Sequence, residues 1–196
     1  MRILVIGASG TIGKAVVAAL QERHEVITAG SKSGDLRVDI SNPASIAAMY
    51  EEAGSLDAVL SAAGSARFNA FENLSDDDFA FSLANKLMGQ VNLVRLGIAR
   101  LNAGGSFTLT SGILAGQPMP GSGAISLVNA GLEGFARAAA LEAPRGIRVN
   151  VVSPPWVSET LTAMGRDPAG GKPAAKVAES YARSVEGTDT GTVFAA

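Results

Sequence analysis

Three glycines near the start of the chain have the spacing of a phosphate-binding turn. Gly7, Gly10 and Gly13 follow a short apolar run at residues 3–6 and precede a stretch with helical periodicity. A buried strand, a glycine turn and a helix in this order form the first half of a dinucleotide-binding βαβ unit. In such a unit Gly7 permits the tight turn, Gly10 lets the backbone approach a pyrophosphate, and Gly13 lets the helix pack closely on the strand. The N–H groups and the dipole of the first helical turn would then favour an anion.

The residue types that the chain lacks exclude several kinds of chemistry. It has no cysteine and a single histidine, His24, so thiolate catalysis, histidine-based metal sites and Ser-His-Asp triads lack their parts. We therefore expect no metal site. The net charge is −2 and no long basic run occurs, so we expect no nucleic-acid partner. No signal peptide is readable and no apolar segment reaches the roughly 18 residues of a membrane span. These features favour a soluble cytoplasmic protein without a membrane partner.

The order of elements along the chain predicts the fold class. A length of 196 residues, with 47% hydrophobic and 17% charged residues, suits a single domain over residues 1–196. Strands are predicted at 2–7, 25–29, 36–38, 56–61, 105–111, 147–152 and 191–194, and helices at 11–22, 43–53, 75–102, 123–143 and 173–184. This alternation predicts an α/β fold, a doubly wound parallel sheet of the Rossmann type with about seven strands and helices on both faces. Residues 165–172 are predicted to form a mobile loop.

Two polar clusters predict where helices begin. Asn42 stands before Pro43, a cap candidate followed by a proline in the first turn. Ser75 is followed by three aspartates at residues 76–78, where the helix dipole favours negative charge. This acidic run could also attract a cation, but a capped and solvated helix start is the favoured interpretation.

The turn after the second predicted strand bears on which nucleotide would bind. In open α/β sheets ligands lie beyond the carboxyl ends of the strands, and an acidic residue here would hold the ribose 2′-hydroxyl of NAD. The sequence instead offers Ser31 and Lys32, a hydroxyl and a cation that suit a 2′-phosphate. NADP(H) is therefore favoured as the cofactor, with NAD possible. The alternative interpretation is an exposed polar turn without a ligand.

Further along, the chain resembles the short-chain dehydrogenase/reductase family. In that family an Asp with a following aliphatic residue borders the adenine, as at Asp39 and Ile40, and an Asn-Ala-Ala-Gly turn follows the fourth strand. Residues 61–64 resemble that turn, with Ser61 in the Asn position. Residues 132–154 are similar to the family's fifth helix and sixth strand almost residue for residue. The resemblance spans the whole chain, although the first glycine loop has the spacing of extended and atypical members.

The glycine loop, the strand ends and the resemblance together predict a set of cofactor-binding residues. The expected residues are Gly7, Ser9, Gly10, Thr11, Ile12, Gly13, Ser31, Lys32, Asp39, Ile40, Ala62, Gly64, Asn129 and Pro154.

The resemblance also implies a catalytic apparatus that this sequence carries only in part. The family uses a hydroxyl to polarise a carbonyl, a tyrosine to exchange the proton, and a lysine that lowers the tyrosine pKa and holds the ribose. Ser111, at the end of the fifth predicted strand, matches the hydroxyl, but Ile125 occupies the tyrosine position and Asn129 the lysine position. The only tyrosines, Tyr50 and Tyr181, fall in predicted helices far from this position. Because isoleucine cannot exchange a proton, the usual mechanism cannot operate unchanged, although Asn129 could still bond a ribose hydroxyl.

Lys86 is the candidate substitute. The family places an Asn three residues before a Gly on the fourth helix, and here Lys86 stands three residues before Gly89. Asn85 is one residue away, about 100° around the helix. A lysine desolvated beside a cofactor can have a lowered pKa and act as an acid or a base. The alternative is a lysine that reaches solvent or completes a structural hydrogen-bond network.

Two functions are consistent with these residues. The first is an NADP(H)-dependent oxidoreductase acting on a small carbonyl or alcohol, with Ser111 polarising the oxygen and Lys86 or a water delivering the proton. The second is a non-catalytic dinucleotide-binding or redox-sensing protein. A third hypothesis is an interaction module that has lost its ligand. It is less favoured, because the glycine loop is intact.

Two further expectations concern the surroundings of the site. Trp156 either lines the open side of the pocket or packs against the last helix. The predicted helices at 75–102 and 123–143 carry apolar residues on more than one face. The family resemblance implies that they pair across a two-fold axis in a homodimer or homotetramer.

Overall fold

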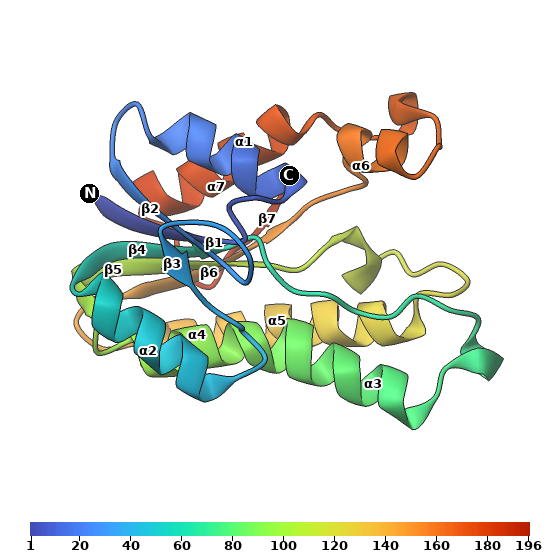
Figure 1. Ribbon diagram of the computed structural model, residues 1–196, viewed down its shortest axis with the longest axis horizontal. Coiled ribbons are helices and arrows are strands. Elements are labelled where there is room, and N and C mark those ends of the chain that lie inside the picture. The colour runs from blue at the N-terminus through green and yellow to red at the C-terminus, as the bar shows by residue number, and fades with distance from the viewer.

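The computed structural model describes all residues 1–196 and is organised around one seven-stranded parallel sheet (Figure 1). The strands are β1 (Arg2–Ile6), β2 (Glu25–Gly30), β3 (Leu36–Arg37), β4 (Leu56–Ser61), β5 (Leu101–Thr110), β6 (Arg148–Ser153) and β7 (Val193–Ala195). Their order across the sheet is β3-β2-β1-β4-β5-β6-β7, and every pair is parallel. The predicted doubly wound fold is confirmed.

Helices cover both faces of the sheet. They are α1 (Thr11–Leu20), α2 (Pro43–Ala53), α3 (Asp76–Ser82), α4 (Gly89–Gly97), α5 (Gly123–Glu142), α6 (Ser158–Ala163) and α7 (Ala174–Glu186). In Figure 1, α1 and α7 lie above the sheet, while α2, α4 and α5 lie below it. A π-helical segment, Leu83–Met88, joins α3 to α4. No helix combines the length and the apolar character that a bilayer crossing needs.

The two faces of the sheet bury separate cores because successive side chains of a strand point to opposite sides. In β1, Ile3 and Val5 belong to the core beneath α1 and α7, whereas Leu4 and Ile6 belong to the larger core against α2, α4 and α5. All four side chains are fully buried, as a parallel sheet covered on both faces requires. This packing fixes β1 at the centre and so fixes the position of the glycine loop that follows it.

The strand order reverses between β1 and β4, which are neighbours although the chain runs outward from them in opposite directions. At such a switch point the loops after the two strands part and leave a crevice at the carboxyl edge of the sheet. The glycine loop follows β1, and residues 62–65 follow β4. The fold therefore places both predicted cofactor-binding turns at one crevice.

Both predicted helix caps are confirmed. The side chain of Asn42 accepts a hydrogen bond from the Ala44 N–H at the start of α2. At the start of α3, Ser75 and Asp78 form a capping box, each side chain accepting from the other residue's backbone N–H. Asp78 is therefore occupied in a cap, and its pKa is lowered mainly by its hydrogen bonds from Ser75.

The predicted helix at 75–102 is wrong at its carboxyl end. The helix stops at Gly97, and β5 begins at Leu101 rather than at 105. Gly97 packs on the ring of Tyr50, where a Cβ would come within 2.4 Å of the tyrosine oxygen. The chain turns there with a hydrogen bond from the Arg100 N–H to the Gly97 carbonyl. Tertiary packing thus ends the helix where its apolar periodicity continues.

The segment after β6 holds more structure than the sequence predicted. The short helix α6 was not predicted, and the loop at 165–172 contains a 3₁₀ turn, Pro168–Gly170. Lys172 pairs with Val157 in an isolated β-bridge, which ties the end of the loop to the chain just after β6. This bridge holds the segment near Trp156 over the carboxyl edge of the sheet.

Candidate functional site

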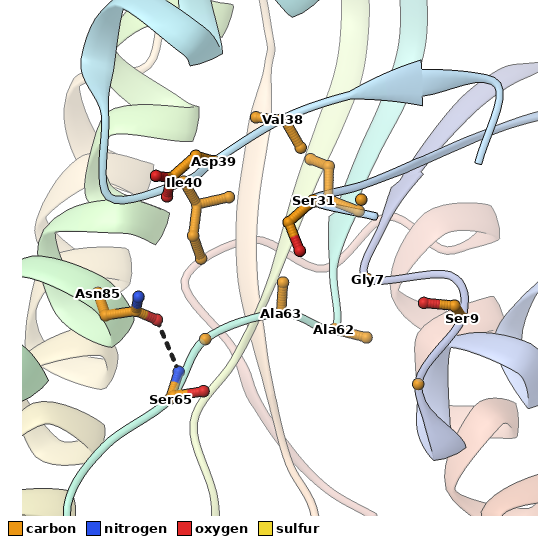
Figure 2. Close-up of a pocket in the computed structure, with 14 residues that line it drawn as sticks. Gly7, Ser9, Ser31, Val38, Asp39, Ile40, Ala62, Ala63, Ser65 and Asn85 are labelled. Atoms are coloured by element: carbon orange, nitrogen blue, oxygen red, sulfur yellow. Dashed lines mark hydrogen bonds between the residues drawn. The ribbon is translucent and has the colours of Figure 1, made fainter. Parts of the chain in front are cut away.

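A cavity of about 330 Å³ lies at the switch point of the sheet. Figure 2 shows the turns after β1, β2, β3 and β4 converging on it. Eight predicted cofactor-binding residues line it: Gly7, Ser9, Gly10, Ser31, Asp39, Ile40, Ala62 and Gly64. We call this space the switch-point cavity.

Two glycines of the first loop are required by close approaches of the backbone. Gly7 has a φ of +82°, and a Cβ there would stand 2.9 Å from the backbone of Ala62. A Cβ at Gly13 would stand 2.0 Å from the carbonyl oxygen of Gly7. Gly13 lines no cavity but lets α1 begin directly against the turn, which is the packing role predicted for it.

The amino end of α1 is left open. Its N-cap is Gly10, with no side-chain cap and no acidic residue in the first turn. By contrast, α2 and α3 are capped by Asn42 and Ser75. The first N–H groups of α1 therefore keep their hydrogen-bonding capacity beside the cavity, and the helix dipole adds to their attraction for an anion. Thr11 lines a shallow neighbouring cavity together with Ser9 and Gly10.

The far end of the switch-point cavity carries hydroxyl and cationic groups. Ser31 lines it, whereas Lys32 is exposed and does not contribute to its wall. Arg37 pairs with Gly30 across β2 and β3, and its exposed guanidinium donates to the Gly34 carbonyl. Arg37 was not predicted from the sequence, because only the register of β3 brings it to this edge. No acidic side chain from the turn after β2 lines the cavity.

A second cavity, of about 270 Å³, adjoins the first; we call it the reaction cavity. Thirteen residues from α1, the loops after β5 and β6, the π-helical segment, α5 and α6 line it: Ile12, Lys86, Ser111, Gly112, Ile113, Leu114, Ile125, Asn129, Pro154, Pro155, Trp156, Val157 and Thr160. The structure thus brings together Lys86, Ser111 and Asn129, as predicted. Trp156 lines the cavity, which favours the first of its two predicted positions.

Lys86 reaches the reaction cavity from the π-helical segment. A π-turn widens a helix and occurs often at functional sites. Its neighbour Asn85 lines the switch-point cavity and accepts a hydrogen bond from the Ser65 N–H at 2.8 Å (Figure 2). The widened turn therefore directs two consecutive side chains to two cavities. The lysine stem passes Gly64, where a Cβ would stand 3.2 Å from it.

The ammonium group of Lys86 has few polar neighbours. Its Nζ donates to the Ser111 carbonyl oxygen at 3.2 Å. No carboxylate pairs with it, and burial alone lowers the pKa of Lys86 from 10.5 to about 8. A lysine with this pKa can both donate and accept a proton near neutral pH.

Ser111 and Asn129 are buried, and their side chains use only part of their hydrogen-bonding capacity within the protein. The Ser111 hydroxyl donates to Glu133 Oε1 at 3.0 Å, and the side chain is 3% exposed. Asn129 Nδ2 donates to the Gly112 carbonyl at 3.5 Å, while its buried Oδ1 has no hydrogen-bond partner. An unpartnered buried oxygen in a cavity wall is costly unless a ligand or water bonds it. Asn129 therefore fits a ligand hydroxyl.

Neither tyrosine of the chain can replace the residue at 125. Ile125 lines the reaction cavity, as the sequence predicted. Tyr50 donates to the Leu93 carbonyl, and Tyr181 bonds Thr110 within the core. Burial raises the pKa of both hydroxyls, and neither lines the cavity. Neither tyrosine hydroxyl is therefore placed to exchange a proton with a ligand in this cavity.

Sequence reasoning missed several residues of the two cavities. Asn85 was placed one position off the site, but it lines the switch-point cavity, where it accepts a hydrogen bond from the Ser65 N–H. Glu133 was quoted within a matching segment but given no role, and its contact with Ser111 requires the packing of α5 on the end of β5. The other unpredicted residues of the switch-point cavity are Ile6, Gly30, Val38, Ala63 and Ser65.

Comparisons with known proteins agree with this arrangement. A family model described as enoyl-(acyl carrier protein) reductase matches residues 7–195. The 3-oxoacyl-(acyl-carrier-protein) reductase FabG of Salmonella typhimurium is 29% identical over 182 residues, which cover 81% of this chain and 74% of that protein.

Solved structures match over nearly the whole chain. The protein lin1944 from Listeria innocua has a TM-score of 0.96 and 46% identity, covering 99% of this chain and 98% of that chain. A small-chain dehydrogenase in complex with NADPH has a TM-score of 0.88 and 26% identity, covering 99% of this chain and 95% of that chain.

Proposed function

Because this chain belongs to the short-chain dehydrogenase/reductase family and is an oxidoreductase, we propose that it acts with NADP(H) on a small carbonyl or alcohol through a proton donor other than tyrosine. One observation carries the proposal. Lys86, with its lowered pKa, lines the same cavity as Ser111, and so does Ile125, the residue that the sequence resemblance aligns with the family's tyrosine. On this proposal the chain is an atypical member that lacks the usual tyrosine and lysine.

The residues of the switch-point cavity fit a nicotinamide dinucleotide. The uncapped start of α1 would hold the diphosphate, and Asp39 and Ile40 would border the adenine. From the reaction cavity, Asn129 Oδ1 would accept from a ribose hydroxyl. The bound cofactor supplies hydride chemistry, which no amino-acid side chain provides. The NADPH complex of a structural neighbour supports this class of cofactor.

We favour NADP(H) over NAD for this chain. An acidic residue after β2 would hold the ribose 2′-hydroxyl of NAD, and here Ser31 lines that end of the cavity instead. Lys32 and Arg37 are exposed at the same edge and would pair with a 2′-phosphate.

In the reaction cavity the reacting oxygen would lie between Lys86 and Ser111. An ammonium group has three hydrogens, and Lys86 uses one on the Ser111 carbonyl. A second would polarise a carbonyl oxygen and deliver the proton during reduction, directly or through a water. The apolar part of the wall, which includes Ile125 and Trp156, suits a small and largely apolar substrate.

Turnover of NADPH with a panel of small ketones and aldehydes tests the proposal. We expect oxidation of NADPH with at least one of them, and weaker turnover for the Ser111→Ala variant. Lys176→Met, at an exposed position of α7, is a matched control for substitutions of Lys86 and keeps full activity. No turnover with any carbonyl, together with tight NADPH binding in a calorimetric titration, would favour the second candidate.

That second candidate is a non-catalytic dinucleotide-binding or redox-sensing protein of the same fold. The observation that favours it is the replacement of the tyrosine position by Ile125 and of the lysine position by Asn129. It requires an intact switch-point cavity and no turnover. Failure to bind either NADPH or NADH would reject both candidates.

We also propose that two copies of the chain associate through α4 and α5. A largely apolar groove runs between these helices, lined by Val94, Ile98, Phe135 and Ala139. Arg95 and Glu142 also line the groove, so a two-fold axis could pair opposite charges. Light scattering should give the mass of a dimer or tetramer, and a monomer would contradict this assembly.

A further inference from the structure

The hydrogen bond between Ser111 and Glu133 sets the direction of the serine hydroxyl. Ser111 follows β5, and Glu133 lies on α5, with Oγ and Oε1 3.0 Å apart. A carboxylate has no hydrogen to donate, so Ser111 must be the donor. Bonds of a hydroxyl to a carboxylate are among the stronger ones in proteins, which favours this orientation over others. The serine hydrogen therefore points away from the reaction cavity.

The side of Ser111 that faces the reaction cavity then offers lone pairs. Asn129 also offers an acceptor, because its Nδ2 donates to the Gly112 carbonyl and its Oδ1 has no partner. Lys86 differs from both, because its ammonium group can donate hydrogen bonds but cannot accept them. The polar wall thus combines one strong donor with acceptors. A ligand oxygen that both donates and accepts satisfies this wall better than one that only accepts.

Glu133 also reaches a second space on the other side of Ser111. A cavity of about 360 Å³ is lined by Glu133 with Gln117 and Ser153, and it shares Ile113 and Pro155 with the reaction cavity. The Glu133 side chain is 17% exposed, whereas Ser111 is 3% exposed. We call this space the outer cavity. The serine and the glutamate therefore form a polar link through the wall that separates the two cavities.

We propose that Ser111 accepts a hydrogen bond from the hydroxyl of an alcohol substrate and that Glu133 holds the serine in this accepting orientation. During oxidation the substrate O–H bond breaks and its proton passes to the neutral amine of Lys86, directly or through a water, while Ser111 keeps its own hydrogen on the bond to Glu133. The two electrons leave the substrate carbon with the hydride that the cofactor accepts, so this inference rests on the proposed function. Glu133 is a positioning residue, because it touches Ser111 and not the substrate.

The proposal distinguishes an alcohol from the ketone of the same shape. An alcohol oxygen can donate to Ser111 and accept from Lys86, while a ketone oxygen can accept from Lys86 only. Replacing Glu133 by Gln keeps the shape of the side chain but allows its amide to donate to Ser111. The serine hydrogen is then free to turn into the reaction cavity. The preference for the alcohol should shrink in that variant.

A binding experiment with cyclohexanol and cyclohexanone tests this without the cofactor. Trp156 lines the reaction cavity and is the only tryptophan, so its indole N–H gives a single NMR signal that reports on occupancy. In the wild-type protein we expect cyclohexanol to bind about fivefold more tightly than cyclohexanone, the value of one net hydrogen bond. Glu133→Gln and Ser111→Ala should each bring the ratio close to one. The Glu52→Gln variant, a matched change at an exposed position of α2, should keep the wild-type ratio.

Equal affinities in the wild-type protein, or an unchanged ratio in both Glu133→Gln and Ser111→Ala, would overturn the proposal. A Trp156 signal that responds to neither compound would also count against it. The proposed function fails separately, through absence of NADPH turnover, in which case the alcohol preference would still stand. Turnover of NADPH without any preference for the alcohol would support the proposed function and overturn the role given to Ser111 and Glu133.

Discussion

The switch-point cavity and the reaction cavity lie side by side but are built from different parts. The first is walled mainly by backbone and small residues at the ends of four strands, such as Gly7, Gly10 and Ala62. The second depends on side chains from separate elements, namely Lys86 from the π-helical segment, Ser111 after β5 and Asn129 on α5. The sheet fixes the first kind of site once its strand order is set. A site built from side chains of separate elements, like the reaction cavity, can change those side chains while the fold and the switch-point cavity stay intact.

The largest effect on stability and on cofactor binding should come from a substitution that disrupts the glycine turn after β1. A Cβ at Gly13 would stand 2.0 Å from the Gly7 carbonyl oxygen, so Gly13→Ala forces the turn and α1 apart. We expect a loss of about 3 kcal/mol or more in the free energy of unfolding, measured with urea, and loss of NADPH binding in calorimetry.

Gly134→Ala is the matched control for that variant. Gly134 is exposed in α5, and a Cβ there would meet nothing within 4 Å. Because alanine favours the helix, this change should stabilise the protein by about 0.5–1 kcal/mol. Similar behaviour of the two variants would mean that the first turn is not tightly packed, which would remove the main difference between the two cavities.

A pH profile should sharpen the account of the reaction cavity. Burial lowers the pKa of Lys86 to about 8, so the protonated donor is present below that pH and is lost above it. The rate of carbonyl reduction should fall by about tenfold per pH unit above pH 8, and alcohol oxidation should rise through the same range. Steady-state rates measured with a non-titrating substrate check this. A reduction rate that stays level well above pH 8 would exclude Lys86 as the proton donor.

The smallest expected effect concerns the rim of the switch-point cavity. Lys32 is exposed and does not line the wall, so its contact with a 2′-phosphate would be partly screened by solvent. Lys32→Ala should weaken NADPH binding by about three- to tenfold and leave NADH binding unchanged, with Lys176→Ala as the surface control. An equal loss for both nucleotides would show that the lysine does not select the phosphate.

The same contrast explains what could be predicted from the sequence. The glycine turn and the strand ends were predictable because local spacing and strand order determine where backbone amides lie. Helix 75–102 was predicted too long because its apolar periodicity continues past Gly97, whereas the close packing on Tyr50 ends it.

Other parts of the site depend on contacts that no local pattern contains. Asn85 lies in a π-helical segment that no sequence pattern predicted, and its place in the switch-point cavity depends on how that segment packs against the turn after β4. Glu133 meets Ser111 only because α5 packs beside the end of β5. The place of Lys86 was predictable from its distance to Gly89, but its lowered pKa requires the burial that the structure provides.

The most direct test of the account is single-turnover reduction of a small ketone by enzyme-bound NADPH, in the wild-type protein and in Lys86→Met. The account predicts that both bind NADPH with similar affinity and that the variant transfers hydride about 100-fold more slowly or worse. Equal rates in the two proteins would contradict the claim that Lys86 has taken over the proton chemistry of the missing tyrosine.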